Sequence, residues 1–424
     1  MLRSAHQEVL SPVLTANRAA ANPAVSAPRL LSLDVMRGIT IAAMILVTDP
    51  GTYSAVFPPL LHAAWQGATP TDMIFPAFLF MVGVSTVFSI EGRLHRGATC
   101  GRLIAHILLR AVVLIVLGLL VNGFPFYDLY HLRIPGVLQR IALCYATSAL
   151  LYLAISRPVG ENPALAARAQ SRSTRTAVEL ATLIAVILVG YWTLLHYFPV
   201  PGFGPARYDS VGYLGAYIDR AVFTTRHLWA WGLTPGYGVT YDPEGLLSTL
   251  PAIANTLLGV LAGVWLRMPR PARSKAADLL YFGALLFLVA WPLSSLMPIN
   301  KRIWTSTFGL LSGGISLLVL GVLYWLLDLR RTPRWTGPVI DFLRIFGTNA
   351  IAAFVLSSFI TATLDAIHFD IAGAAMSLHQ AAHRYLFASW LPPRIGSLAY
   401  AFAIVALNAG LLYPLYRKHI FLRI

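Results

Sequence analysis

The sequence predicts an all-α, polytopic helical membrane protein that crosses the bilayer about ten times. Of its 424 residues, 57% are hydrophobic and only 12% are charged, whereas soluble proteins carry roughly 25% charged residues. The mean hydropathy is +0.67. This apolar content excludes a disordered chain, and two cysteines, Cys100 and Cys144, are too few for a disulfide scaffold.

Ten apolar segments recur along the chain, and each approaches the ~20 residues that a helix needs to cross the hydrocarbon core. They cover residues 35–49, 72–90, 103–122, 136–155, 177–198, 249–266, 278–297, 305–327, 340–363 and 397–415. Residues 1–28 lack the continuous apolar core of a signal peptide. We therefore expect a flexible cytoplasmic tail, residues 1–28, followed by one transmembrane domain, residues 29–424.

The distribution of the 32 Lys and Arg residues predicts the orientation of the chain. If consecutive connections alternate sides, most of these residues fall on the side of the N-terminus, so both termini are expected in the cytoplasm. The net charge of +15 then reports topology, and no nucleic-acid partner is needed to explain it. Arg110, Arg140 and Arg344 fall inside spans, where a charge usually faces a cavity or a partner.

Two outward connections, residues 199–248 and 364–396, are long and rich in aromatic residues. Because Trp and Tyr favour the boundary between membrane and water, we expect both connections to be structured there. The second contains an amphipathic stretch, residues 375–390. Its His379 and His383 are interpreted as one face of an interfacial helix, since no acidic residue separates them as in a zinc protease, and no metal site is expected.

The first outward loop, which joins the first two predicted spans, contains His62 and Asp72 but no Lys or Arg. Histidine is the side chain best suited to exchange a proton near neutral pH, and a carboxylate can orient it. The alternative is a surface histidine and an Asp72 that only caps the second span. The residues alone leave both interpretations open.

Six motifs in fixed order give the chain a specific resemblance from about residue 29 to the C-terminus. They read LSLDVMRG at 31–38, HAAWQGATPTDMIFP at 62–76, RIPGVLQRI at 133–141, DPEGLLST at 242–249, PINKRIWT at 298–305 and GTNA at 347–350. With these motifs the chain resembles the transmembrane acyltransferases related to heparan-α-glucosaminide N-acetyltransferase.

The resemblance implies transfer of an acetyl group from acetyl-CoA to the amine of a terminal glucosamine, with a central histidine on the outer side that maps onto His62. Asp72 is its expected orienting partner. The family places an Asn after the first span, where this chain has Thr48 and Asp49, so the role of that Asn passes to Asp49 or is lost. The residues that the motifs suggest for acceptor binding are Trp65, Asp242, Glu244 and Asn349.

The donor, acetyl-CoA, carries several phosphate charges for which arginines are natural partners. The residues expected to bind it are Arg37, Arg140, Arg344, Asn300 and Lys301. The alternative for the arginines is that they extend to lipid headgroups. Because acetyl-CoA is made in the cytoplasm, we expect a channel through the bundle, with the nucleotide at the inner mouth and the thioester near His62.

From this resemblance we expect the chain to be an acyl-CoA-dependent membrane acyltransferase that modifies an amino sugar or glycan. His62 acts either as a general base or as a transient acyl carrier. If the chain is bacterial, we expect it in the inner membrane with its catalytic loop on the periplasmic side. The alternatives are a proton-coupled sugar or acyl-carrier transporter and an inactive scaffold, while Gly313 and Gly314 leave a homodimer open.

Overall fold

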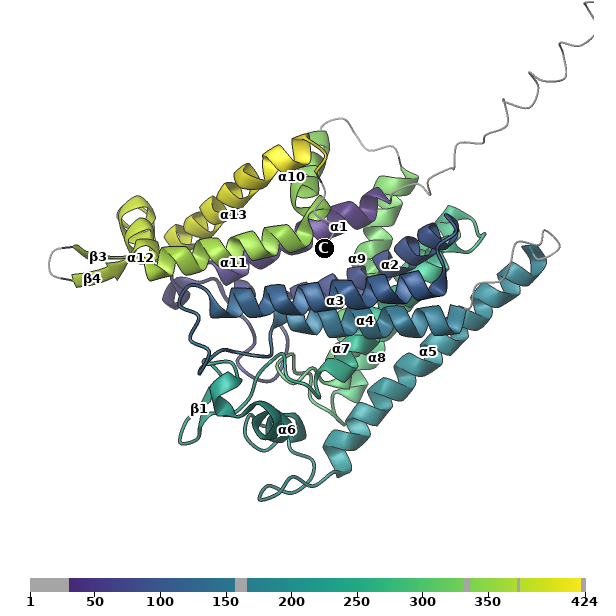
Figure 1. Cartoon of the computed structure of the whole chain (residues 1–424), viewed down its shortest axis with the longest axis horizontal. Coiled ribbons are helices and arrows are strands. Elements are labelled where there is room, and N and C mark those ends of the chain that lie inside the picture. Colours follow the sequence, from purple (N-terminus) through teal and green to yellow (C-terminus); the bar gives the residue numbers. More distant parts are fainter. Residues whose placement is uncertain (1–29, 157–165, 331–335, 372–373, 421–424) are drawn as a thin grey trace, which may run out of the picture. The chain divides into compact units, whose positions relative to one another are not determined.

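The computed structural model describes residues 30–156, 166–330, 336–371 and 374–420. The predicted tail, residues 1–28, lies outside these described residues. The long helices are α1 (Leu31–Thr48), α2 (Ile74–Leu94), α3 (Cys100–Gly123), α4 (Val137–Ser156), α5 (Ala166–Tyr197), α7 (Thr249–Arg267), α8 (Ala272–Leu293), α9 (Ser306–Leu323) and α13 (Pro393–Arg417) (Figure 1). A π-helical turn, Tyr324–Leu329, continues α9.

Within the described residues, nine helical segments are long and apolar enough to cross a membrane, and α10 (Gly337–Thr348) with α11 (Ala350–Ala366) forms a tenth, broken one. The polytopic helical fold is thereby confirmed. The prediction of a continuous span over 340–363 is wrong, because α10 and α11 meet at an angle of 81°. Asn349, between them, has a non-helical backbone with φ −129° and ψ 47°.

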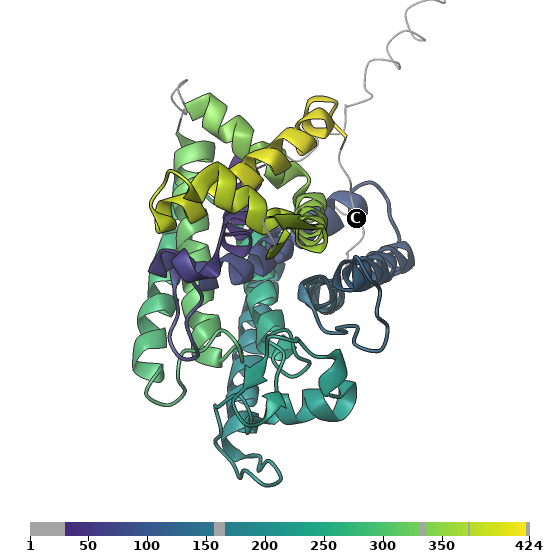
Figure 2. The ribbon, with the colours of Figure 1, turned by 90° about the vertical axis from the view of Figure 1, so that its left-hand side faces the viewer.

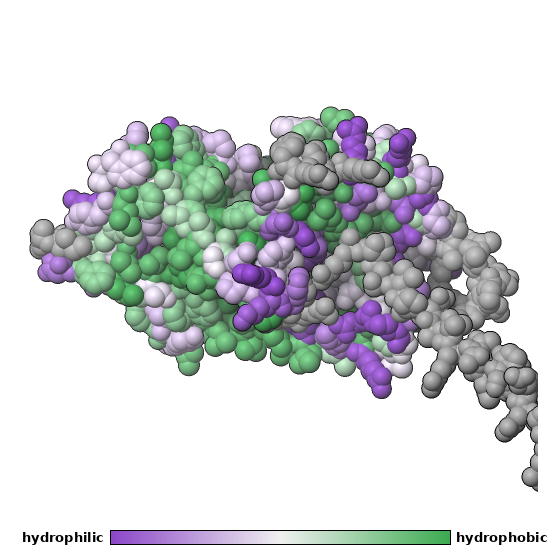
Figure 3. All heavy atoms as spheres, turned by 90° about the horizontal axis from the view of Figure 1, so that it is seen from above, coloured by the Kyte–Doolittle hydropathy of each residue, from purple (hydrophilic) through white to green (hydrophobic). Residues whose placement is uncertain are grey.

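The helices differ in how far they are enclosed by protein. The most enclosed is α7, with 78% of its apolar window buried, whereas the corresponding value is 22% for each of α3, α5 and α8. Hydrophobic side chains form a broad area on the face of the molecule seen from above (Figure 3). The exposed apolar sides of α3, α5 and α8 are therefore the surfaces that lipid would cover.

Close backbone contacts fix the central helices against one another. A Cβ atom added to Gly259 of α7 would lie 1.9 Å from the Phe80 carbonyl oxygen of α2, and one added to Gly83 would lie 2.0 Å from the Thr256 carbonyl oxygen. Small residues of this kind allow transmembrane helices to approach closely. Gly38 gives α1 the same close contact with Leu343 of α10.

The two long connections contain short elements rather than spanning helices. Residues 199–248 form α6 (Leu214–Phe223) and the hairpin of β1 (Leu233–Thr234) and β2 (Gly238–Val239). The other connection forms the hairpin of β3 (His368–Ile371) and β4 (Ala374–Ser377), then α12 (Leu378–His383) and a π-helical turn, Arg384–Ala388. The predicted amphipathic helix over 375–390 is thus only partly helical, because residues 375–377 pair as strand β4.

Figure 2 shows the connection around α6 gathered beyond one end of the helices. Its aromatic side chains pack into a buried cluster that includes Tyr191 of α5, Tyr213, Tyr241 and Ile303. Trp65, from the loop between α1 and α2, packs against this cluster. Three segments that are distant in sequence therefore meet the loop that carries His62 at one end of the bundle.

Candidate active site

His62 and Asp72 are joined by a direct hydrogen bond within the loop between α1 and α2. The distance from His62 Nδ1 to Asp72 Oδ1 is 2.7 Å. Asp72 Oδ2 also accepts hydrogen bonds from the backbone N–H of Ala63, at 3.1 Å, and of Thr69, at 2.9 Å. Asp72 therefore does both of the things that the sequence left as alternatives: it caps the turn that precedes α2 and it contacts the histidine.

The two side chains differ strongly in exposure, since the side chain of His62 is 43% exposed and that of Asp72 is 1% exposed. An ionised Asp72 can only accept hydrogen bonds, so it selects the tautomer of His62 that carries its proton on Nδ1. The remaining nitrogen, Nε2, is then an acceptor on an accessible ring. This arrangement fits a general base or a nucleophile oriented by a carboxylate.

The loop of Asn300 and Lys301 lies directly against the loop of His62. The backbone N–H of Gly67 donates to the Ile299 carbonyl oxygen at 2.7 Å, and Gly67 forms a parallel bridge with Asn300. Asn300 is itself buried, and its Oδ1 accepts hydrogen bonds from the backbone N–H of Arg302 and Ile303. Asn300 therefore shapes this turn.

Lys301 places an ammonium group among the acidic side chains of the site. Burial lowers the pKa of Lys301, while the carboxylates of Glu244 and Asp72 oppose this shift without cancelling it. A cation that interacts electrostatically with Asp72 is suited to stabilise negative charge that develops next to the histidine–carboxylate pair.

Arg133 forms ion pairs with the buried carboxylates of Asp242 and Glu244. Arg133 is not among the site residues that the sequence predicts. Arg133 donates from Nε to Asp242 at 2.8 Å, and from Nη2 to Asp242 at 2.6 Å and to Glu244 at 2.5 Å. Burial raises the pKa of Glu244, but Arg133, Arg140 and Lys301 outweigh this effect and hold it below its usual range. The available signals in the sequence were the opposite charges in two connections that were predicted to face outward, and the motifs at 133–141 and 242–249 that contain them.

Arg140 lies in the same region as the Arg133 ion pairs. The sequence groups it with Arg37 and Arg344 as residues expected to bind the donor. It is 1% exposed, and its Nη2 donates to the Gly245 carbonyl oxygen at 2.9 Å and to Ser248 Oγ at 2.5 Å. Its guanidinium lies over the Trp304 ring, 5.3 Å from the centroid. Because Arg140 is buried, the alternative that it extends to lipid headgroups is wrong.

Arg37, Arg344 and Asn349 lie at the other end of the bundle, where α1 begins. Arg37 pairs with Asp34 at 2.5 Å, and Arg344 contacts Asp341 at 3.4 Å. Asn349 donates to the Ile420 carbonyl oxygen at 3.1 Å. The structure therefore divides the expected donor-binding residues between the two ends and separates Asn349 from His62.

Asp49 occupies a third environment, at the end of α1. Thr361 Oγ1 lies 2.6 Å from Asp49 Oδ1, and Thr48 Oγ1 lies 3.4 Å from Oδ2. Burial raises the pKa of Asp49 to about 6, against the opposing effects of these hydroxyls and of His379. The hydrogen bonds of Asp49 thus lead to α11 rather than to His62.

Trp65 contributes to the architecture of the site. Its Nε1 donates to the Tyr208 carbonyl oxygen at 2.7 Å, and its ring meets Tyr241 edge-on at a centroid distance of 5.0 Å. Tyr241 in turn accepts a hydrogen bond from Arg302 at 2.8 Å. These contacts tie the His62 loop to the connection around α6, and Tyr241 and Arg302 are two further residues that sequence reasoning missed.

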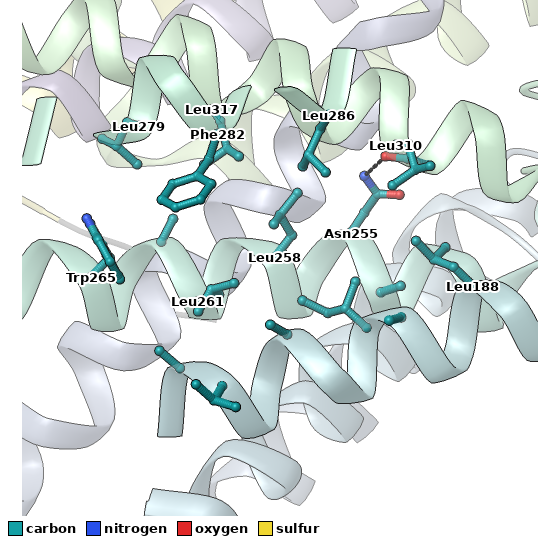
Figure 4. Close-up of a pocket in the computed structure, with 18 of the residues that line it drawn as sticks. Leu188, Asn255, Leu258, Leu261, Trp265, Leu279, Phe282, Leu286, Leu310 and Leu317 are labelled. Carbon is teal, nitrogen blue, oxygen red and sulfur yellow. Dashed lines mark hydrogen bonds between the residues drawn. The ribbon is translucent and has the colours of Figure 1, made fainter. Parts of the chain in front are cut away.

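A cavity of about 440 Å³ lies elsewhere, among α5, α7, α8 and α9 (Figure 4). It is lined almost entirely by apolar side chains, including Leu188, Leu258 and Phe282. Asn255, one of its polar lining residues, is already bonded to the Gly309 carbonyl oxygen and to Trp304 Nε1. His62, Asp72 and Lys301 are not among the residues that line this cavity, so the cavity and the candidate site are separate.

The sequence of this chain is similar to one family model and to two curated proteins. Residues 29–200 match the family model described as heparan-α-glucosaminide N-acetyltransferase, catalytic. The chain is 32% identical over 359 residues to the human protein of that name, covering 77% of this chain and 52% of the relative. For the mouse protein the values are 31% over 361 residues, 78% and 53%. The chain thus spans about half the length of these relatives.

Proposed function

Because the chain is related to the heparan-α-glucosaminide N-acetyltransferase family, we propose that this integral membrane protein transfers an acetyl group from acetyl-CoA to an amino sugar or glycan. The observation that carries the proposal is the exposed His62, bonded through Nδ1 to the buried Asp72 with Nε2 left as an acceptor. Nothing in this pair selects among acyl acceptors, so the acceptor is proposed from the family alone.

In the direct route, the nitrogen or oxygen of the acceptor attacks the thioester carbonyl carbon. At the same time, His62 Nε2 takes the proton from that amine or hydroxyl. The new C–N or C–O bond forms, the C–S bond breaks, and the CoA thiolate leaves with the proton that His62 returns. Asp72 stabilises the intermediate imidazolium, and Lys301 supports the negative charge on the carbonyl oxygen.

In the second route, His62 Nε2 attacks the thioester carbon itself. The N–C bond to the acetyl group forms, the C–S bond breaks, and CoA leaves as the thiolate before the acceptor binds. The amine or hydroxyl of the acceptor then attacks the acetyl carbon, the N–C bond breaks, and the proton lost by the acceptor passes to the CoA thiolate or to solvent, which restores the imidazole. The contacts of Asp72 and Lys301 serve this route equally. The two routes differ in kinetics, since only the second one is ping-pong and allows label to remain on the protein.

For the donor, we propose that Arg140, Asn300 and Lys301 lie toward its acyl end, while Arg37 and Arg344 meet its phosphates at the opposite end of the bundle. This assignment requires a path along the helices. It also requires the end where α1 begins to face the cytoplasm, as the distribution of basic residues predicts. Asp242, Glu244 and Trp65 would then border the acceptor, and in a bacterium the site would face the periplasm.

The test uses purified protein with acetyl-labelled acetyl-CoA and three acceptors: glucosamine, an N-deacetylated oligosaccharide and a glycan that offers only hydroxyl groups. Labelled product with an amine acceptor supports the proposal. If no donor is consumed and CoA causes no thermal shift, the proposal is wrong. Proton-coupled uptake of sugar into proteoliposomes without consumption of acetyl-CoA would instead show a transporter.

A further inference from the structure

A second histidine–carboxylate pair lies where the His62 loop leaves α1. His379 of α12 contacts Asp365 of α11 through Nδ1, at 2.9 Å, and the Pro50 carbonyl oxygen through Nε2, at 3.1 Å. Its ring is stacked on Tyr400 of α13, with centroids 4.9 Å apart and planes 4° apart. The ring is therefore fixed from three directions, and one of its contacts is to the backbone of the His62 loop.

The hydrogen-bond partners of the two ring nitrogens indicate the protonation state of His379. A backbone carbonyl oxygen can only accept, and so can an ionised carboxylate. Both ring nitrogens must therefore donate, which requires the imidazolium form of His379. The neutral ring satisfies only one of its two partners, so the link between Asp365 and Pro50 depends on a proton.

The backbone beyond Pro50 is held at the same point by α13 and α12. The N–H of Gly51 donates to the Ser397 carbonyl oxygen at 3.2 Å, and the N–H of Thr52 donates to Ser397 Oγ at 3.1 Å. A Cβ atom added to Gly51 would lie 2.2 Å from the ring of His383. Residues 50–52 are thus the point at which the loop is attached to α12 and α13.

We propose that His379, paired with Asp365, is a proton-dependent clamp on residues 50–52 that positions the loop carrying His62. The role of the clamp in catalysis rests on the proposed function. His379 acts through the loop, so it is a positioning residue. When the imidazolium loses its proton, the carboxylate of Asp365 keeps the remaining hydrogen on Nδ1, because a charged group is the stronger acceptor. The hydrogen bond from Nε2 to the Pro50 carbonyl oxygen is then lost, and the start of the loop is released from α12.

Titratable groups on the His62 loop, α11, α12 and α13 surround His379 and can influence whether it holds its proton. Asp49 and Tyr53 lie on the His62 loop, Asp365 on α11, His383 on α12 and Tyr400 on α13. Asp49 and Asp365 are acids that favour the imidazolium. His383 opposes it when charged, but burial and His379 lower the pKa of His383.

Amide hydrogen exchange tests the clamp without depending on activity. The full-length protein in detergent is compared with His379→Gln at about pH 6 and at about pH 9, on either side of the ordinary histidine range. At the lower pH we expect the Gly51 and Thr52 amides to exchange about tenfold faster in the variant, as loss of one charge-assisted hydrogen bond implies. At the higher pH the two proteins should become similar, since the wild type then lacks the proton on which the proposed clamp depends.

Asp365→Asn provides a second variant that keeps the size of the side chain, and it should have the same effect at the lower pH. The matched control is His368→Gln, whose exposed imidazole is hydrogen-bonded to the Ala366 carbonyl oxygen and whose substitution should leave exchange at residues 50–52 unchanged. Equal exchange in all four proteins at both pH values overturns the clamp. A difference that persists undiminished at the higher pH overturns its dependence on a proton.

The pH profile of kcat supplies the link to catalysis. The ratio of the wild-type kcat to the His379→Gln kcat should be well above one at about pH 6 and should fall toward one at about pH 9, because the clamp is then open in the wild type as well; loss of the Lys301 proton affects both proteins and leaves this ratio unchanged. If the exchange prediction holds while no variant, including the wild type, transfers acetyl groups, the clamp stands and the proposed function fails. If the wild type is active and this ratio does not change with pH, the clamp does not position His62.

Discussion

At the scale of single residues, Asp72 combines a cap with an orienting contact because both tasks need a fixed acceptor. Its two oxygens bind His62, Ala63 and Thr69, so the geometry that begins the second span also sets the tautomer of the histidine. The family resemblance predicted this pairing, whereas the ten-residue spacing within one loop left it open. The pairing of Arg133 with Asp242 could not be predicted, because 109 positions separate them.

The substitution Asp72→Asn tests the orienting role. We expect kcat to fall about 10²-fold or more, with a small change in KM, because the amide cannot stabilise the imidazolium that forms on His62. The matched control is Asp128→Asn, since Asp128 makes the same 2.7 Å contact with His131 on the surface. A kcat for Asp72→Asn within twofold of the wild type would remove Asp72 from the mechanism.

Arg133→Ala tests the buried ion pair. The substitution leaves Asp242, which is 0% exposed, without its partner, and we expect unfolding free energy to fall by about 3–5 kcal/mol. Arg207→Ala is the control, because the Arg207–Asp209 pair is 46% and 41% exposed and should contribute less than about 1 kcal/mol. Denaturant titration in detergent measures both. Equal losses would show that burial does not set the strength of these pairs.

Asp219 predicts a specific dependence of stability on pH. Burial raises its pKa to about 7, and its Oδ1 accepts from the Leu246 N–H while Oδ2 has no partner among the described residues. A raised carboxyl pKa stabilises the fold at low pH, and this contribution is lost as the pH rises through about 7. Asp219→Asn should therefore gain stability over the wild type as the pH rises from about 4 to about 7, by at most about 4 kcal/mol. A constant difference across this range, measured by thermal unfolding, would contradict this.

At the scale of elements, hydropathy predicted nine spans as single helices because each is an uninterrupted apolar run. It missed the break between α10 and α11, since an average over twenty residues does not register one non-helical residue, Asn349. The contacts that hold Asn349 come from Ile420, which lies far along the chain. Breaks of this kind depend on tertiary partners that a local pattern does not contain.

Gly259→Val tests the contact between α2 and α7. The new side chain would collide with the backbone of Phe80, so the helices must separate, and we expect destabilisation of about 2–3 kcal/mol. Gly410→Val in α13 is the control, because nothing lies within 4 Å of a Cβ atom at that position. Thermal unfolding of the two variants in the same detergent should differ by several degrees. Similar melting temperatures would show that α2 and α7 are not tightly packed.

At the scale of the whole molecule, the cysteines offer a test of orientation. Cys100 is exposed at the start of α3, and Cys144 is buried. If the end where α1 begins faces the cytoplasm, a membrane-impermeant maleimide should leave right-side-out vesicles unlabelled and should label Cys100 after lysis, whereas the exposed Gln66→Cys should react before lysis. Labelling of Cys100 in intact vesicles would reverse the proposed topology.

The account as a whole depends on His62 as the centre of acyl transfer. The most direct measurement is kcat for acetyl transfer from acetyl-CoA to an amine-bearing sugar by the wild type, His62→Ala and the surface control His131→Ala. We predict that His62→Ala loses about 10²–10⁴-fold in kcat, with an unchanged melting temperature, and that His131→Ala keeps the wild-type rate. An active wild type together with a fully active His62→Ala would contradict the account.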